Sequence, residues 1–345
     1  MKFFKDKNII HKIRKGDYSA LYFNRTKEIL LKEKNFKNAT MQIFQKNKQS
    51  IFCGVNEVLE LLKISTGYFD KNKWIDKSEE LKIKYVKEGK EINSWESVMH
   101  ITGPYVYFVH LESIYLGILS RRTLVASNVR RIINVAQNKP VIFFGDRFDY
   151  FLNQAGDGYA ANIGGINGVC TEAQGSWFGG KVTGTIPHSL IAINNGKTLE
   201  AVEQFTRHIK NTNAIALVDF ENDCLKTSLE VARKFKKKLW GVRVDTAENM
   251  IDESLKKRKL LGVNPDLIKL LRKALDQEGF QYVKIICSGG FNEEKVKLFE
   301  KEKTPVDIYG IGSSILKGSN DFTADIVKVE NKLISKVGRK FKLIK

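Results

Sequence analysis

The stretch AIALVDFENDCLKTSLEVARKFKKKLWGVRVD (214–245) decides the fold class. It opens with a run of apolar residues, continues with the spacing of an amphipathic helix, and closes with a second apolar run. Near-continuous apolar strands that alternate with amphipathic helices are typical of a parallel sheet covered by helices on both faces. The stretch therefore predicts a strand–helix–strand unit of an α/β protein.

Similar units lie on both sides of this stretch. Apolar runs typical of strands occur at 141–144, 181–186, 214–220, 239–245, 283–290 and 306–312. Helical patterns lie between most of them, at 198–210, 224–238, 264–277 and 292–302. Six such units in about 170 residues favour closure into a barrel over an open sheet. We therefore predict an α/β barrel domain over residues 139–319.

The first hundred residues predict a different, mixed α+β module. GVNEVLELLK (54–63) has the spacing of a short amphipathic helix, and LKIKYVKEGKEINSW (81–95) alternates like a hairpin around Gly89. The pattern from 105 to 137 predicts one long helix, with a break near Ser120 left open.

These patterns divide the chain into three parts. Residues 1–103 form an N-terminal domain, 104–138 form a helical connection, and 139–319 form the barrel. The C-terminal tail alternates again without a helix beside it. We expect residues 320–345 to join the N-terminal domain.

Composition excludes several classes of protein. Hydrophobic residues make up 42% of the 345 residues, which supplies a sizeable core and excludes disorder as the main state. No apolar stretch is long enough for a membrane span, and no apolar run follows the basic N-terminus, so we expect a cytoplasmic protein without a membrane partner. The four cysteines form no CxxC pair, which argues against a zinc knuckle or a disulfide framework.

The chain is strongly basic. Its 58 Lys and Arg against 39 Asp and Glu give 58 − 39 = +19, and residues 1–50 alone carry 13 basic residues against 4 acidic ones. Such a charge suits nucleic acid, a membrane surface or a polyanionic small molecule. No helix-turn-helix, zinc-finger or RNP-type pattern accompanies the charge, so we interpret most of it as a solvated surface and expect no nucleic-acid partner.

Small residues at the last two predicted strand ends point to phosphate. In a barrel, functional groups collect at the carboxyl ends of the strands, and phosphate groups are often bound at the final ones. Backbone amides of small residues before a helix can approach a phosphate closely, although ordinary tight turns use the same residues. The candidates at these ends are Ser288, Gly289, Gly290, Gly312 and Ser313.

Charged residues follow the other predicted strands. Asp219 and Asp245 suit ribose hydroxyls or a Mg²⁺ ion, or else cap the helices that follow them. Arg147 and Arg243 suit a phosphate or carboxylate, or else form plain salt bridges. His188, the one histidine at a predicted strand end, is a candidate nucleophile or general base.

Several nucleotide-binding motifs are absent. The chain has no GxxxxGK[ST] loop, which excludes a Walker-type ATP site. Gly156-Asp157-Gly158 lacks the third glycine and the preceding strand of a dinucleotide fingerprint.

Five strings in order resemble a known family. They are FGDRFDYFLNQAGDGYAANIGGINGVCTEAQGSWFGGKVTGTIPHSL (144–190), LVDFENDC (217–224), GVRVDT (241–246), SGGFN (288–292) and YGIGSS (309–314). Together they resemble the type II phosphoribosyltransferases, specifically the nicotinate phosphoribosyltransferases, and the likeness runs from about Tyr22 to Asp325. The resemblance implies an irregular α/β barrel with an N-terminal α+β open-faced sandwich domain.

The resemblance also implies an activity. Members of the family condense nicotinate with phosphoribosyl pyrophosphate to give nicotinate mononucleotide and pyrophosphate, a salvage step of NAD biosynthesis. They require Mg²⁺ and use ATP as a co-substrate through a phosphorylated histidine, which joins pentosyltransferase and ligase chemistry. They act as homodimers whose active sites are shared between two subunits.

Site residues follow from the resemblance position by position. His188 matches the phosphorylated histidine, Phe144 the aromatic residue that stacks on the pyridine ring, and Arg147 the arginine beside it. Tyr22 resembles a second stacking aromatic supplied by the partner subunit. Thr171 lies in the region where relatives that use nicotinamide carry an aspartate that recognises the substrate. No carboxylate matches that aspartate at Thr171, which favours a negatively charged ring as the substrate.

The remaining matches concern the sugar and its phosphates. Asp219, Arg243 and Asp245 match ribose and pyrophosphate positions, and either aspartate is a candidate ligand for Mg²⁺. The glycine and serine residues at the last two strand ends match the 5′-phosphate loops.

Three other functions compete with this one. Quinolinate phosphoribosyltransferase has the same fold class, but a dicarboxylate substrate needs a tighter basic cluster and no phosphorylated histidine. A non-catalytic, basic barrel that binds nucleic acid is motivated by charge alone. A Schiff-base aldolase would use Lys284 near the fifth predicted strand.

Overall fold

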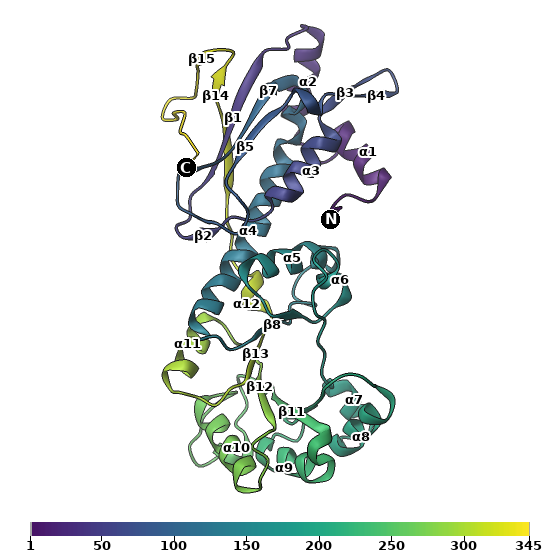
Figure 1. Cartoon of the computed structure of the whole chain (residues 1–345), viewed down its shortest axis with the longest axis vertical. Coiled ribbons are helices and arrows are strands. Elements are labelled where there is room, and N and C mark those ends of the chain that lie inside the picture. Colours follow the sequence, from purple (N-terminus) through teal and green to yellow (C-terminus); the bar gives the residue numbers. More distant parts are fainter. Residues whose placement is uncertain (1, 345) are drawn as a thin grey trace. The chain divides into compact units, whose positions relative to one another are not determined.

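The computed structural model describes residues 2–344, which divide into two units. The first comprises Met1–Ser127, Tyr159–Gly164 and Gly318–Lys345, and the second comprises Asn128–Gly158 and Gly165–Lys317. The first unit is an α+β sandwich and the second an irregular α/β half-barrel (Figure 1), so the predicted fold class is confirmed.

The first unit is built on a five-stranded antiparallel sheet. Its strand order is β15 (Lys332–Leu333), β14 (Phe322–Val329), β1 (Asn38–Gln45), β7 (Ser97–Pro104) and β5 (Lys82–Tyr85). The C-terminal segment thus returns to the N-terminal module, where Ala39 pairs with Val329. Two short strand pairs are separate from this sheet: β2 (Ser50–Ile51) with β6 (Glu91–Ile92), and β3 (Gly67–Asp70) with β4 (Lys73–Asp76).

Helices cover one face of this sheet. They are α3 (Val55–Ser65) and the first part of α4 (Glu112–Val135), while α1 (Lys7–Lys15) packs on α3 and α2 (Leu21–Lys32) packs on the 3₁₀ turns of 105–111. The core between helices and sheet includes Ile43, Met99, Leu61 and Tyr115, all fully buried. On the other face, Gln42 exchanges hydrogen bonds with the backbone of Lys340 and Lys342, so the C-terminal segment covers part of that surface.

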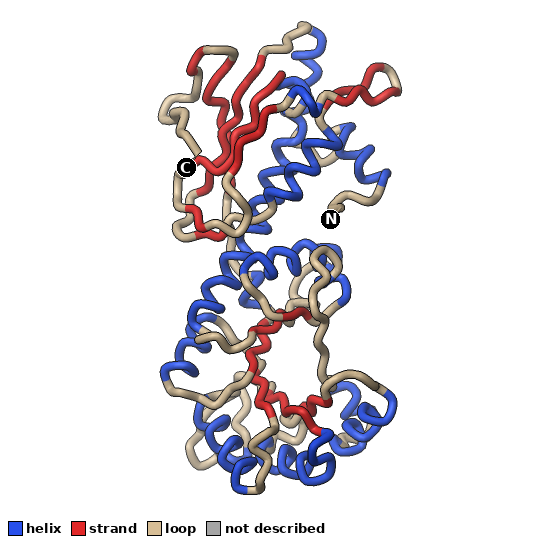
Figure 2. The backbone as a smooth tube through the Cα atoms, in the orientation of Figure 1, coloured by secondary structure: helices blue, strands red, loops and turns tan. Residues whose placement is uncertain are grey.

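The second unit contains a six-stranded parallel sheet. Its order is β10 (Ala214–Leu217), β11 (Leu239–Val244), β12 (Lys284–Cys287), β13 (Ile308–Ile311), β8 (Val141–Phe143) and β9 (Gly168–Val169). The sheet curves around the interior of the unit (Figure 2). Residues of β8 and β10 are all buried, which agrees with helices on the outside and a packed interior.

Eight helices connect or follow these strands among the described residues. They are α5 (Gln154–Gly164), α6 (Glu172–Gly175), α7 (His188–Ile193), α8 (Thr198–His208), α9 (Cys224–Phe235), α10 (Pro265–Gln277), α11 (Glu293–Lys301) and α12 (Ser313–Leu316). The four helices predicted over 198–302 are confirmed as α8, α9, α10 and α11. Single-turn 3₁₀ helices lie at 78–80, 105–107, 109–111, 151–153, 236–238 and 253–255.

The predicted strand at 181–186 is wrong. Val182 makes one isolated parallel bridge with Val169, and the segment continues as an extended chain between β9 and β10. β9, a strand that the sequence did not predict, has only two residues, so the segment 181–186 cannot form a continuous ladder of hydrogen bonds with it. A single bond from the Ile186 N–H to the Ile215 carbonyl joins the segment to β10, which makes the barrel irregular.

Two predictions for the first unit also need correction. The hairpin around Gly89 does not form, because the Gly89 N–H donates to the Phe52 carbonyl and β5 pairs with β7 instead of β6. The long helix begins at Glu112 and runs through Ser120 without a break, while Tyr105–Leu111 form two 3₁₀ turns. Aromatic and β-branched residues in YVYFVHL have low helix propensity, which explains the late start.

Among the described residues, no helix combines the length and the hydropathy that crossing a membrane requires. All four cysteines are free thiols.

Candidate active site

A cavity of about 350 Å³ lies at the carboxyl ends of β8, β11, β12 and β13. This is the end of a parallel sheet at which loops from several strands meet. The residues that line it include nine of those predicted from the sequence: Phe144, Arg147, Arg243, Asp245, Ser288, Gly289, Gly290, Gly312 and Ser313. The structure therefore brings together residues that lie up to 169 positions apart in the chain (313 − 144 = 169).

A chain of polar contacts orders one wall of the cavity. Arg243 donates from Nη1 to Thr185 Oγ1 at 2.7 Å, and its Nη2 lies 3.6 Å from Asp245 Oδ2. The Ser288 hydroxyl donates to Asp245 Oδ1 at 2.8 Å. Both the anion-clamp and the salt-bridge interpretations of Arg243 therefore have a basis, because one guanidinium can serve an ion pair and still face a ligand.

Arg243 is a desolvated cation. Burial lowers the pKa of its guanidinium, and the carboxylates of Asp245 and Asp219 oppose that shift. Its Nε is buried without a hydrogen-bond partner among the described residues. The Arg243 Cζ lies 5.9 Å from the ring centre of Phe144, so the cation and the aromatic ring are close neighbours on the cavity wall.

His188 and Asp219 form a pair beside the cavity. His188 Nε2 lies 3.0 Å from Asp219 Oδ2, and Pro187, directly before His188, lines the cavity. Burial raises the pKa of the Asp219 carboxyl, and the nearby His188 partly offsets the shift. Neither His188 nor Asp219 is part of the cavity lining itself.

The helix-cap interpretation of the two aspartates is wrong. Asp223 caps α9 through the Lys226 N–H, and Asn264 caps α10 through the Leu267 N–H. Neither Asp219 nor Asp245 caps α9 or α10, so both carboxylates remain candidates for a functional role at the strand ends.

Glycine is required at the two predicted phosphate loops for different reasons. Gly289 and Gly290 have φ angles of 88° and 65°, in the left-handed region that favours glycine. At Gly312, a Cβ atom would lie 2.6 Å from the Phe144 carbonyl oxygen and 2.5 Å from the Phe148 ring. The first loop needs an unusual backbone conformation, and the second needs space.

A lysine that the sequence analysis missed supports the first loop. Lys295 on α11 donates from Nζ to the Gly289 carbonyl at 2.8 Å and lies over the Phe291 ring. Burial lowers the pKa of this ammonium group. Its position in the first turn of α11 gives no signal in the sequence, because helices carry lysines throughout this chain.

Asp146 and Cys170 are two further cavity residues that the sequence analysis did not select. The Cys170 thiol donates to Asp146 Oδ1 at 3.5 Å, and burial, followed by the Asp146 charge, raises the pKa of Cys170 to about 12. The thiol is thus protonated and not a nucleophile. Asp146 follows the strand-end pair Phe144-Gly145 directly, which was a usable signal.

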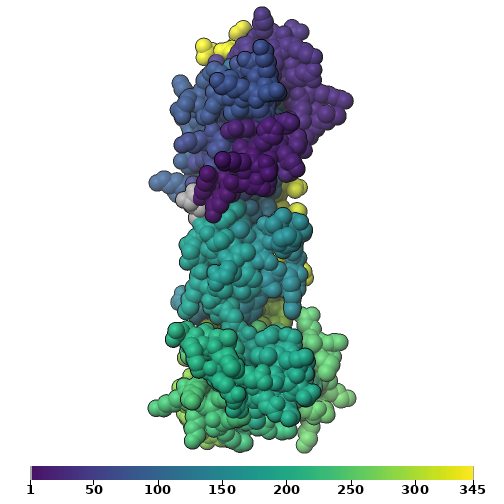
Figure 3. All heavy atoms as spheres, turned by 90° about the vertical axis from the view of Figure 1, so that its right-hand side faces the viewer, coloured from purple at the N-terminus to yellow at the C-terminus, as the bar shows by residue number. Residues whose placement is uncertain are grey.

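Thr171 and Tyr22 lie outside the cavity lining. Thr171 caps α6 in a capping box with Gln174, and its hydroxyl donates to Gln154 Oε1 at 2.7 Å. Tyr22 belongs to α2 of the first unit, where its side chain is 63% exposed near the exposed residues Tyr18 and Leu21. The N-terminal segment lies on the outer surface of that unit (Figure 3, dark purple).

The acidic residues fit a magnesium ion only in part. No group of three His, Cys, Asp or Glu side chains suited to a metal occurs in residues 2–344. However, Asp219 Oδ1 is buried without a hydrogen-bond partner among the described residues, and the Asp245 charge acts on the same carboxyl. Mg²⁺ typically takes one or two carboxylates together with substrate phosphates, so this donor set is compatible with it.

Comparison with known proteins agrees with the fold. Residues 20–123 match the family model described as quinolinate phosphoribosyl transferase, N-terminal domain. The crystal structure of a nicotinate-nucleotide pyrophosphorylase from Pyrococcus furiosus is 31% identical, with a TM-score of 0.82 over 99% of this chain and 82% of that chain. The chain belongs to the type II phosphoribosyltransferase family.

Other relatives of this type II phosphoribosyltransferase are more distant. The nicotinate phosphoribosyltransferase of Bacillus subtilis is 24% identical over 67% of this chain and 45% of its own length. One from Mycobacterium tuberculosis is 26% identical over 70% of this chain and 51% of its own length. The chain thus spans about half the length of these curated relatives.

The structure of human nicotinic acid phosphoribosyltransferase shares the fold of this type II phosphoribosyltransferase. Its TM-score is 0.68 at 16% identity, over 92% of this chain and 75% of that one.

Replacing Asp219 tests the cost of burying its charge. Because its pKa is raised in the folded state, the carboxyl favours folding fully below its unfolded pKa, and this contribution is lost as pH rises through the folded pKa. Asn cannot ionise. The stability of Asp219→Asn relative to the unchanged protein should therefore rise as the pH increases from about 4, the ordinary pKa of an aspartate, through the raised folded pKa. Urea unfolding across this range measures it, and a relative stability that falls with pH would contradict the assignment.

Proposed function

We propose that the protein is a nicotinate phosphoribosyltransferase. It joins nicotinate to phosphoribosyl pyrophosphate, releases pyrophosphate and makes nicotinate mononucleotide for NAD biosynthesis by salvage. The observation that carries the proposal is the convergence on one cavity of aromatic rings, two arginines, two carboxylates and two glycine loops, with a histidine–aspartate pair beside it. The names of the curated relatives support the choice of nicotinate.

The cavity supplies each part that this glycosyl transfer needs. The Phe144 ring stacks on the pyridine, and Arg147 binds its carboxylate, which holds the ring nitrogen in line with C1 of the ribose. As the C1–pyrophosphate bond breaks, positive charge builds on the sugar and negative charge on the leaving group. Asp245 stabilises the sugar, and Arg243 stabilises the pyrophosphate.

The loops Ser288–Gly290 and Gly312–Ser313 hold the 5′-phosphate through their backbone amides and hydroxyls. The left-handed conformations of Gly289 and Gly290 turn the backbone sharply at the cavity, which lets a phosphate approach it without a side chain between them. Asp219 and Asp245 would hold Mg²⁺, which balances the charge of the pyrophosphate when bound.

The histidine–aspartate pair suits the proposed coupling to ATP. With Nε2 donating to Asp219 Oδ2, the tautomer of His188 leaves its Nδ1 lone pair free to accept a phosphoryl group. Asp219 then stabilises the imidazole through the remaining N–H, much as a carboxylate orients a catalytic histidine. His188 is nearly half exposed, so a phosphoryl donor can reach it.

Quinolinate is the competing substrate, and the family model of the N-terminal domain carries its name. Quinolinate has two carboxylates, and the cavity offers Arg147 and Arg243 for anions. Arg243 is assigned to the pyrophosphate, which leaves Arg147 for the ring, and the carboxylate of Asp146 also lines the cavity. A second substrate carboxylate would meet like charge, which favours a ring with one carboxylate.

The proposal includes a homodimer in the cytoplasm, with Tyr22 of each subunit completing the site of the other. The exposed aromatic and aliphatic side chains of Tyr18, Leu21 and Tyr22 support a covered surface at the start of α2.

The substrate assignment is tested by mononucleotide formation from phosphoribosyl pyrophosphate and Mg²⁺. Nicotinate, nicotinamide and quinolinate are compared, each with and without ATP. We expect product from nicotinate because its one carboxylate can bind Arg147 of the cavity. ATP should increase the yield through His188. Product from quinolinate alone would overturn the substrate while leaving the fold class intact.

His188→Ala tests the coupling to ATP. The variant should lose stimulation by ATP yet retain slow transfer, since the cavity lining is unchanged. Steady-state rates with and without ATP measure the effect. His208→Ala, an exposed histidine at the end of α8, is the matched control and should behave like the unchanged protein. Full stimulation by ATP in His188→Ala would rule out the phosphorylated histidine.

Mixing two inactive variants tests the shared site. Tyr22→Ala and Phe144→Ala should each lose most activity, because each removes one side of the ring stack. After refolding together, half of the dimers would carry one intact site, and activity should recover to about a quarter of normal. Mixing Phe144→Ala with Arg243→Ala is the control and should recover nothing, since both residues belong to one cavity. No recovery in the first mixture would argue against the shared site.

A further inference from the structure

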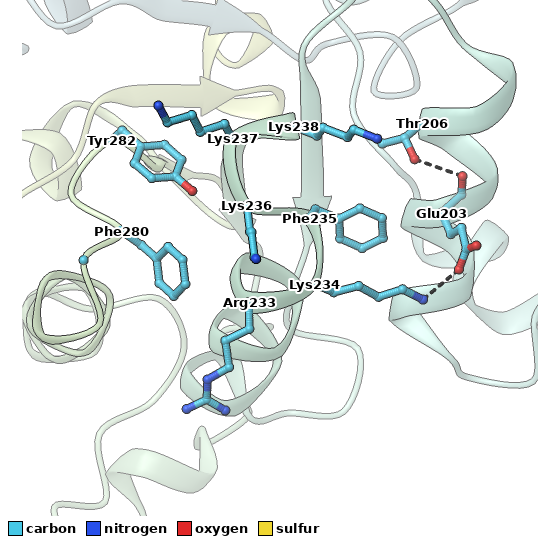
Figure 4. Close-up of a pocket in the computed structure, with 11 residues that line it drawn as sticks. Glu203, Thr206, Arg233, Lys234, Phe235, Lys236, Lys237, Lys238, Phe280 and Tyr282 are labelled. Carbon is cyan, nitrogen blue, oxygen red and sulfur yellow. Dashed lines mark hydrogen bonds and ion pairs between the residues drawn. The ribbon is translucent and has the colours of Figure 1, made fainter.

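A second, larger cavity of about 1080 Å³ lies in the second unit. Its residues come from the end of α8, the end of α9, the turn 236–238 and the turn 279–282 (Figure 4). These segments directly precede β10, β11 and β12, so they lie at the amino ends of the strands. The cavity, here called the basic groove, is therefore at the opposite end of the parallel sheet from the candidate active site.

The groove carries an excess of positive charge. Five cations line it against one carboxylate, that of Glu203; the cations are Arg233, Lys234, Lys236, Lys237 and Lys238. Figure 4 shows the lysines spreading from the turn after α9, with Lys237 directed toward the loop of Tyr282 and Lys238 toward α8. A polyanion that enters the groove would meet ammonium groups from several directions.

Ion pairs account for only two of the five cations. Lys234 Nζ lies 2.7 Å from Glu203 Oε2, and Arg233 Nε donates to Glu278 Oε2 at 2.7 Å. Lys236, Lys237 and Lys238 are exposed and contact no carboxylate among the described residues. Three adjacent charges thus repel one another without compensation from the protein.

Dipole stabilisation of α9 does not explain these three lysines. Cations in the last turn of a helix do stabilise it, and Arg233 and Lys234 occupy that turn. The three lysines follow the helix, and Lys236 has a φ of 47°, a conformation that glycine or asparagine adopts more easily.

Aromatic rings lie beside the lysines. Phe280 and Tyr282 form an edge-to-face pair with ring centres 6.3 Å apart, and Tyr282 is 40% exposed. Planar bases stack on such rings, and their phosphates bind lysines, so the combination fits a ligand that carries both. A purely inorganic anion would leave the aromatic side of the groove unused.

We propose that the basic groove binds a nucleoside polyphosphate at a site separate from the catalytic cavity. The base stacks on Tyr282, and the phosphates bind Lys236, Lys237 and Lys238. The groove's volume accommodates one nucleotide, and its distance from the strand ends that carry the catalytic groups means that the bound nucleotide is not a reactant.

Photolabelling with an ATP that carries an azide on its adenine ring tests this site. Trypsin cleaves after Lys273 and Lys284, so a base on Tyr282 marks the peptide Ala274–Lys284. That peptide contains no residue of the catalytic cavity, and its label cannot come from ATP at His188. We expect the label on this peptide and its displacement by unlabelled ATP.

Two triple variants provide the contrast. K236Q/K237Q/K238Q should lower the labelling of this peptide about tenfold at subsaturating nucleotide, because three charged contacts are lost. K297Q/K301Q/K303Q removes the same charge from exposed positions on and after α11 and should leave labelling unchanged. Equal labelling of both variants would overturn the proposal, as would label confined to peptides of the catalytic cavity.

A competition experiment separates a free nucleotide from nucleic acid. Unlabelled ATP should displace the photolabel at a lower concentration than a short single-stranded oligonucleotide does, when both concentrations are counted in nucleotide units. The reverse order would overturn the proposal in favour of a nucleic-acid surface.

Discussion

The second unit depends on the requirement that a parallel sheet be covered on both faces. Each strand must be followed by a crossover that returns the chain to the same starting edge, and here helices such as α9 and α10 provide it. All strands then end at one edge, whatever the order of their residues in the chain. Phe144 after β8, Arg243 in β11 and Gly312 after β13 meet around one cavity for this reason alone. The chemistry of the site is thus a consequence of chain direction.

Glycines at and after the end of β13 leave room for neighbouring side chains at this edge of the sheet. A Cβ at Gly310 would lie 2.4 Å from the Phe144 ring, so the ring occupies the volume that a side chain on β13 would take. Gly312 leaves room in the same way for Phe148 and the Phe144 carbonyl. The aromatic ring proposed to hold the pyridine is therefore positioned by the absence of side chains on a neighbouring strand. Arg243, which is linked to Asp245 and through it to Ser288, has its Cζ 5.9 Å from the centre of this ring.

The sequence predicted the parts of the fold that follow from local periodicity. The helices from α8 to α11 and five of the six parallel strands have unbroken apolar patterns, and residues at their ends converge as expected. The segment 181–186 has the same composition as a strand, but its pairing depends on a two-residue neighbour that no pattern reveals. The turn at Gly89 was misassigned because its partner, Phe52, is distant in sequence. Likewise, no spacing rule links His188 to Asp219 or Cys170 to Asp146, since those pairs depend on which strands become neighbours.

The return of β14 to the N-terminal sheet has a consequence for the order of folding during synthesis. β1 leaves the ribosome early, yet one of its two neighbours in the sheet is made only after the whole half-barrel has been translated. Until then β1 presents an unpaired edge with buried apolar residues such as Met41 and Ile43. The half-barrel consists of consecutive strands and helices and can assemble as it emerges. The first part of the chain to be made would then be the last to reach its final structure, and a chain stalled before β14 would expose an edge suited to aggregation.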